Sequence, residues 1–200
     1  MKWIDARGSG FLPGWVVGAT LLVLLALPWS RAWLEASMTR HMLVQMPLLA
    51  AAGFVLARAL SADWRERLRA RAGGVVPCLL LAMATTTFWM IPRALDLALE
   101  QGSAEAAKFL SLPLLAGVPL ALAWPHIGIF GRGFVWSNLA SMLAVLGWLY
   151  RAAPIRVCNA YGETSQFTAG TWMIVLAVTI FAAWLASLLL SPAGSHPPQG

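Results

Sequence analysis

Charged residues are scarce in this chain. They make up 11% of its 200 residues, whereas hydrophobic residues make up 60%; an ordinary globular domain is about a quarter charged. This balance excludes a typical soluble domain and is typical of a membrane protein. Basic residues exceed acidic ones by six, but they form no soluble basic patch, so we expect no nucleic-acid partner.

Cysteines and catalytic motifs are also lacking. Two cysteines without a CxxC pair exclude a disulfide framework, and the topology predicted below places Cys78 and Cys158 at opposite faces of a membrane. The chain contains no GxSxG, HExxH, Walker or GxGxxG motif. The apolar cores hold no carboxylate pair of the kind that an ion transporter needs. We therefore expect no enzyme, and a small transporter or channel is a third and less favoured class of function.

Long apolar runs are abundant. Each has about the 17–20 residues that a helix needs to cross a bilayer, and the gaps between them are too short to fold alone. The sequence predicts an all-α fold: one polytopic transmembrane domain over residues 1–190, followed by a disordered tail, 191–200. The first run is taken as a retained span, because no small-x-small signal cleavage site follows it. The six predicted spans are Phe11–Trp29, Met42–Leu60, Val75–Pro92, Phe109–Pro125, Phe134–Tyr150 and Thr171–Leu190.

The loop from Arg58 to Arg71 is the most basic part of the chain. By the positive-inside rule it should face the cytoplasm, and the same orientation places Lys2, Arg7 and Arg132 inside. The N-terminus is then cytoplasmic. We expect a multi-pass protein of a bacterial inner membrane, with the lipid bilayer as its first partner.

Prolines and glycines inside the second and fourth spans, such as Pro47 and Pro113, predict kinks in both. The external stretch 93–108 alternates apolar and acidic residues in a way that favours a short amphipathic helix along the outer surface. This helix could cover a site that opens on that face.

The stretch "SMTRHMLVQM", residues 37–46, holds one histidine and three methionines. Met38, His41, Met42, Gln45 and Met46 fall within about 140° of one helical face. Imidazole and thioether together suit Cu(I), but methionine also fills apolar cores, so packing is the competing interpretation. The candidate metal ligands are His41, Met38 and Met42, with Met90 from a second helix; Met46 and Cys158 are weaker candidates.

Three segments, in order, resemble the CtaG-type family of cytochrome c oxidase assembly factors, polytopic membrane proteins linked to copper delivery to haem-copper oxidases. The first contains "RHMLVQMPLLAAAG", similar to the family's His-Met-x-x-His segment before a proline-leucine run. The second, "FWMIPRALDLALEQGSAEAAKFLSLPLLAGV", is similar to Trp-His-x-Pro followed by an amphipathic loop and a span. The third, "APIRVCNAY" followed by "SQFTAGTWM", is similar to a tyrosine-containing loop with Asp-Gln-x-x-Ala-Gly-x-x-Met.

The departures from the family pattern are as informative as the matches. His41 takes either the second histidine position, with Ser37 at the first, or the first, with Gln45 at the second. Met90 stands for the histidine of Trp-His-x-Pro. The three further departures are a later histidine replaced around Lys108 and Phe109, an Asp replaced by Ser165, and an absent first span.

The resemblance implies an assembly factor without enzymatic turnover that handles Cu(I) at the outer face and has a haem-copper oxidase subunit as partner. The departures leave an alternative open: a membrane scaffold that binds a partner and has lost its metal site. In that alternative Tyr161, Gln166 and the 93–108 stretch form contact surface.

Overall fold

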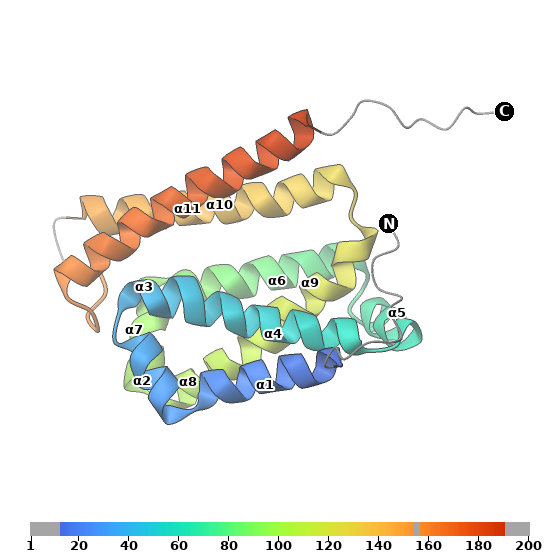
Figure 1. The fold of residues 1–200 in the computed structure, drawn as a ribbon, viewed down its shortest axis with the longest axis horizontal. Coiled ribbons are helices and arrows are strands. Elements are labelled where there is room, and N and C mark those ends of the chain that lie inside the picture. Colours follow the sequence, from blue (N-terminus) through green and yellow to red (C-terminus); the bar gives the residue numbers. More distant parts are fainter. Residues whose placement is uncertain (1–12, 154–156, 191–200) are drawn as a thin grey trace.

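A computed structural model describes residues 13–153 and 157–190, and every regular element within these ranges is helical. The predicted all-α membrane fold is thereby confirmed (Figure 1). The predicted disordered tail, 191–200, lies outside the described residues.

The helices include two π-helical segments (η1, η2) and one 3-10 segment (η3). Their bounds are α1 Gly14–Ala26, α2 Pro28–Glu35, α3 Met38–Arg40, η1 His41–Gln45, α4 Met46–Ala59, α5 Ala62–Arg71, α6 Val75–Met90, α7 Pro92–Glu100, α8 Gly102–Ser111, η2 Leu112–Gly117, α9 Val118–Ala123, η3 Trp124–His126, α10 Ile129–Ala152 and α11 Glu163–Leu189.

Four continuous helices are long and apolar enough to cross a membrane: Met38–Ala59, Gly102–His126, Ile129–Ala152 and Glu163–Leu189. The first and third predicted spans are shorter than expected. The first ends at Ala26, because Leu27 is extended before Pro28, and the third ends at Met90, before Pro92. Each belongs to a bent helix pair, α1–α2 at 70° and α5–α6 at 79°, so six spans result if each pair is counted as one.

The second and fourth spans, for which kinks are predicted, each contain a π-helical segment. In η1 the Met46 amide donates to the His41 carbonyl, and in η2 the Val118 amide donates to the Pro113 carbonyl. Each segment ends two residues before a proline, Pro47 or Pro119. A proline ring clashes with the carbonyl four residues earlier, and a widened turn relieves that clash.

Two glycines bring η2 into backbone contact with α4. A Cβ on Gly53 would lie 2.1 Å from the Pro113 carbonyl oxygen, and a Cβ on Gly117 would lie 2.1 Å from the Ala50 carbonyl oxygen. Small residues allow membrane helices to approach this closely. The approach sets the spacing between the second and fourth spans, which carry the two halves of the site described below.

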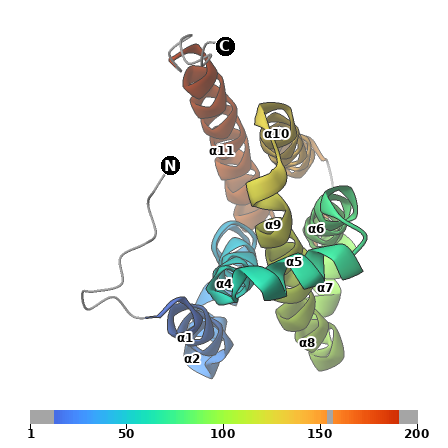
Figure 2. The ribbon, with the colours of Figure 1, turned by 90° about the vertical axis from the view of Figure 1, so that its right-hand side faces the viewer.

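The remaining helices surround this pair. Helix α1 packs on α4 and α6 packs on α9, while α10 and α11 form a hairpin that contacts α3. Figure 1 shows α2, α3, α7 and the connection from α10 to α11 at one end of the bundle, and α5 at the other. We call these the α2–α7 end and the α5 end. Figure 2 shows α5 lying across the ends of its neighbours.

The predicted amphipathic helix in 93–108 is present as α7, which buries Ala94, Leu95 and Ala98. It is shorter than predicted and ends at Glu100, because Gln101 is extended and Gly102 begins α8. The second half of the stretch therefore belongs to the fourth span.

Candidate functional site: a buried polar centre at the α2–α7 end

A cluster of polar side chains lies inside the α2–α7 end. It comprises Glu35 at the end of α2, His41 and Gln45 in η1, Lys108 in α8, and Tyr161 in the connection to α11. His41, Gln45 and Lys108 are completely buried. Ionisable side chains inside a membrane bundle are rare and mark functional positions. We call these five residues the polar centre.

The Lys108 ammonium group lies between three acceptors. Its Nζ donates to Glu35 Oε1 at 2.9 Å, to His41 Nε2 at 3.0 Å and to Gln45 Oε1 at 3.3 Å. An ammonium group has three N–H donors and no acceptor. All three donors therefore have partners, and the Glu35 carboxylate balances the positive charge.

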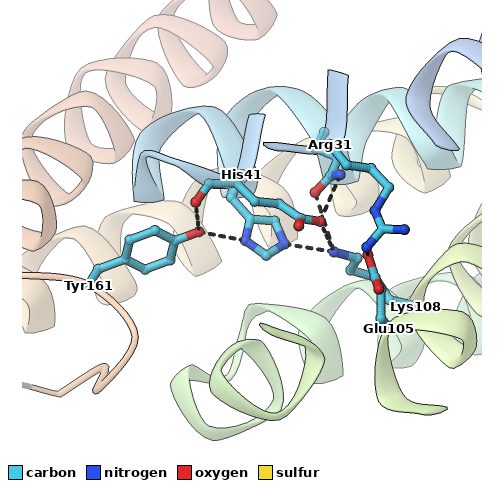
Figure 3. Close-up of polar contacts among 7 residues, drawn as sticks. Arg31, His41, Glu105, Lys108 and Tyr161 are labelled. Carbon is cyan, nitrogen blue, oxygen red and sulfur yellow. Dashed lines mark hydrogen bonds and ion pairs between the residues drawn. The ribbon is translucent and has the colours of Figure 1, made fainter. Parts of the chain in front are cut away.

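The hydrogen bonds define the tautomer of His41. Nε2 accepts from Lys108, so Nδ1 carries the proton and donates to the Tyr161 hydroxyl at 2.9 Å. The Tyr161 hydroxyl in turn donates to the Glu35 carbonyl at 2.8 Å. Figure 3 shows the imidazole held between Tyr161 and Lys108. Both ring nitrogens of His41 are engaged.

The local sequence explains why these side chains meet. The wide turn of η1 places His41 and Gln45 toward Lys108 together, and Gln45 Nε2 donates to Glu35 Oε1 at 3.0 Å. One amide thus contacts both members of the Lys108–Glu35 ion pair. π-helical turns are frequent at functional sites, and η1 supplies two of the five residues of the polar centre.

A second ion pair, between Arg31 and Glu105, lies beside the centre. A cavity of about 270 Å³ adjoins it, lined by Arg31, Glu105 and Phe109 among others. The Phe109 ring lies 5.3 Å from Lys108 Nζ. The cavity therefore brings the surface close to Lys108, with the ion pair and an aromatic ring in between.

The structure buries every predicted ligand of the second span on one side, as the periodicity indicated. Met38, His41 and Met42 are completely buried, and Met46 and Met90 are 2% and 4% exposed. The four methionines belong to the main apolar core, alongside leucines and alanines. Among the described residues, no three His, Cys, Asp or Glu side chains are grouped so that they could hold a metal.

Cys158, one of the two weaker ligand candidates, contacts Asp96 of α7. Its thiol donates to Asp96 Oδ1 at 2.8 Å, and the Asn159 and Ala160 amides donate to the same carboxylate. Burial, with the hydrogen bond to Asp96, raises the pKa of the Cys158 thiol to about 12. In the described structure the thiol and the two amides tie this connection to Asp96 of α7.

Gln166 anchors the same connection from the other side. Its Oε1 accepts from the Val157 and Cys158 amides at 3.0 and 3.3 Å. Ser165, which stands where the resemblance expects an aspartate, accepts from the Met38 amide at 3.2 Å. These contacts fix the loop that delivers Tyr161 to His41.

Sequence reasoning missed Glu35 as a site residue and treated Lys108 only as a replaced histidine. A signal for Lys108 exists: it is one of two lysines in the chain and directly precedes a predicted apolar span. A lysine there requires an anionic partner. Glu35, however, is distant in sequence, and nothing in the pattern identified it as that partner.

Comparison of the chain with protein-family models, with curated proteins and with solved structures finds no match.

Proposed function

We propose that this chain is a membrane assembly factor for a haem-copper oxidase that acts as a partner-binding scaffold, with the Lys108 ammonium in the position of a metal ion. The observation that carries this proposal is the set of three acceptors around Lys108 Nζ. The oxidase partner rests on the resemblance of the three sequence segments. The α2–α7 end faces outward if the basic loop 58–71 faces the cytoplasm.

Electrostatics favours the scaffold over copper handling. The Lys108–Glu35 pair is neutral as a unit, and the Lys108 side chain is completely buried. A Cu(I) ion on His41 Nε2 would take the place of a hydrogen bond and would add a second positive charge next to the ammonium. Such like-charge contacts inside a protein are strongly unfavourable. Metal loading at His41 therefore requires Lys108 to leave the centre.

Copper handling is the second candidate, favoured by the burial of Met38, Met42, Met46 and Met90 in one core. In that candidate a Cu(I) ion takes thioether ligands and displaces Lys108 from His41. The donor types suit Cu(I) better than zinc or magnesium.

Metal analysis and Cu(I) titration of the purified full chain separate the two. The scaffold predicts no Cu(I) above background in the wild-type protein and a gain of Cu(I) binding in Lys108→Met, which removes the ammonium and adds a thioether. The gain should disappear in the double variant Lys108→Met/His41→Ala. Arg93→Met, an exposed charge on α7, is the matched control and should gain nothing.

Copper bound by the wild type and lost in His41→Ala would establish the second candidate and overturn the scaffold. The partner is tested separately, by affinity capture of the oxidase subunit with wild type and His41→Ala. Equal capture by both supports a scaffold that needs no metal, whereas no capture of the oxidase subunit contradicts the assembly role.

A further inference from the structure

A second cavity lies at the α5 end, away from the polar centre. It has a volume of about 520 Å³ and lies between the end of α4, the start of α5 and the end of the α9–η3 segment. Its charged or titratable lining residues are Arg58, Asp63, Arg65, Glu66 and His126, and its floor includes Leu122. Nothing in the proposed function uses it.

The guanidinium groups in this cavity lack acidic partners among the described residues. Arg65 Nη1 donates to the Arg58 carbonyl at 3.3 Å, and neither side chain takes part in an ion pair of the described chain. Glu66 is paired with Arg69. With that carboxylate neutralised, the two arginines outweigh Asp63, and the cavity favours an anion.

The cavity lies where lipid headgroups are expected. The spans Met38–Ala59 and Gly102–His126 both end at it, and α5 is turned by 79° from α6, so that it runs across the ends of the neighbouring helices. Trp64 is 53% exposed, with Arg67 stacked 5.8 Å from its ring centroid. Tryptophan and arginine together are typical of the membrane–water interface.

We propose that this cavity binds the phosphate of an acidic phospholipid, with Arg58 and Arg65 donating to its oxygens. The guanidinium fork matches phosphate geometry and forms charge-assisted hydrogen bonds. The Leu60 and Trp64 side chains beside the cavity are exposed and offer apolar surface to the acyl chains of a lipid. A free anion has no acyl chains and would not use this surface. This site is independent of the polar centre and of the proposed oxidase partner.

Native mass spectrometry of the detergent-purified full chain tests the proposal, with phosphatidylglycerol, phosphatidylcholine and inorganic phosphate as probes. We expect retained phosphatidylglycerol and little phosphatidylcholine. Arg58→Gln/Arg65→Gln should weaken phosphatidylglycerol binding at least about tenfold, because charge-assisted hydrogen bonds are lost. The control Arg67→Gln/Arg71→Gln removes the same charge from α5 outside the cavity and should weaken it far less.

Equal losses of phosphatidylglycerol affinity in the two double variants would show that the lipid is attracted by the overall charge of α5. That result would overturn the proposed site. Inorganic phosphate that displaces the lipid completely would assign the cavity to free anions and overturn the lipid assignment. Arg65→Lys keeps the positive charge but removes the forked guanidinium group. We expect its affinity for phosphatidylglycerol to lie between that of the wild type and that of Arg58→Gln/Arg65→Gln. An affinity equal to that of the wild type would contradict recognition by the guanidinium group.

Discussion

The two ends of the bundle use positive charge in opposite ways. At the α2–α7 end Lys108 is completely buried, and each of its N–H donors has a partner within the protein. At the α5 end, arginines lie on or near the surface, and Arg58 and Arg65 border an open cavity and have no carboxylate partner among the residues that the structure describes. One end satisfies its charge internally, while the other offers charge to an external anion.

The difference follows from how deeply each charge is buried in the protein. A charge inside the bundle loses its hydration and is stable only with a counter-ion and hydrogen bonds. A charge at the headgroup level keeps water and lipid phosphate as partners. Changes at the α2–α7 end should therefore affect folding, and changes at the α5 end should affect binding.

The largest effect concerns Cys158, which reports whether the α2–α7 end is closed. Burial and Asp96 raise the pKa of its thiol from 9.0 to about 12, so the thiolate fraction at pH 8 should fall on the order of a thousandfold. In a Cys78→Ala background, alkylation of the folded protein should be slow until the pH approaches 12. The unfolded chain should react near pH 9. Equal rates in the folded and unfolded protein would show that this end is open.

Glu35→Gln should destabilise the fold by about 3 kcal/mol. It leaves the Lys108 ammonium buried without its counter-ion, and the lower part of the usual range applies because the Glu35 side chain is still 15% exposed. Denaturant unfolding in detergent measures the change. Glu100→Gln, an exposed acid on α7, is the control and should stay within about 0.5 kcal/mol.

The double variant Glu35→Gln/Lys108→Met should recover most of that loss, because an apolar replacement removes the unpaired charge. A double variant as unstable as Glu35→Gln would mean that the carboxylate contributes through contacts other than its ion pair with Lys108.

Gly53→Ala should destabilise the fold by about 1–3 kcal/mol, the usual range for an overpacked core. The added methyl group would lie 2.1 Å from the Pro113 carbonyl oxygen, so α4 must move away from η2. Gly102→Ala, where a Cβ meets nothing within 4 Å, should be nearly neutral. Equal effects would show that helix propensity, rather than the close approach, decides the result.

Composition and periodicity predicted the architecture well, because apolar runs and proline positions act locally. The buried face of residues 38–46 and the helix in 92–100 follow from spacing alone. The ends of α1 and α6 were placed two or three residues too late, since Pro28 and Pro92 were counted within the spans although each begins a new helix.

The polar centre was only half predictable. His41 is identified by its residue type, but its two hydrogen-bond partners come from α8 and from the connection before α11, and Glu35 of α2 joins the centre through Lys108. The pairing of Glu35 with Lys108 joins residues 73 positions apart, and no local pattern encodes it. The copper ligands predicted from spacing remain a prediction, which Cu(I) titration of the wild type and of His41→Ala tests.

Tyr161→Phe should destabilise the fold by about 1–2 kcal/mol, because it removes the hydroxyl that connects His41 Nδ1 with the Glu35 carbonyl. The chain supplies a matched control. The Tyr150 hydroxyl is also buried but has no hydrogen-bond partner among the described residues, so Tyr150→Phe should be neutral or slightly stabilising. Similar losses in both variants would show that ring packing, and not the hydrogen bonds of the polar centre, governs the α2–α7 end.

The smallest stability effects should come from the α5 end. Arg65→Gln and Arg67→Gln should each change the free energy of unfolding in detergent by less than about 0.5 kcal/mol, as surface substitutions usually do. Neither guanidinium group takes part in an ion pair among the described residues, so neither substitution removes one. Added phosphatidylglycerol should stabilise the wild type and Arg67→Gln more than Arg65→Gln, because a ligand that binds only the folded state raises its stability. A loss for Arg65→Gln in lipid-free detergent as large as that for Glu35→Gln would contradict the contrast, since the arginine would then be structural rather than a contact for lipid.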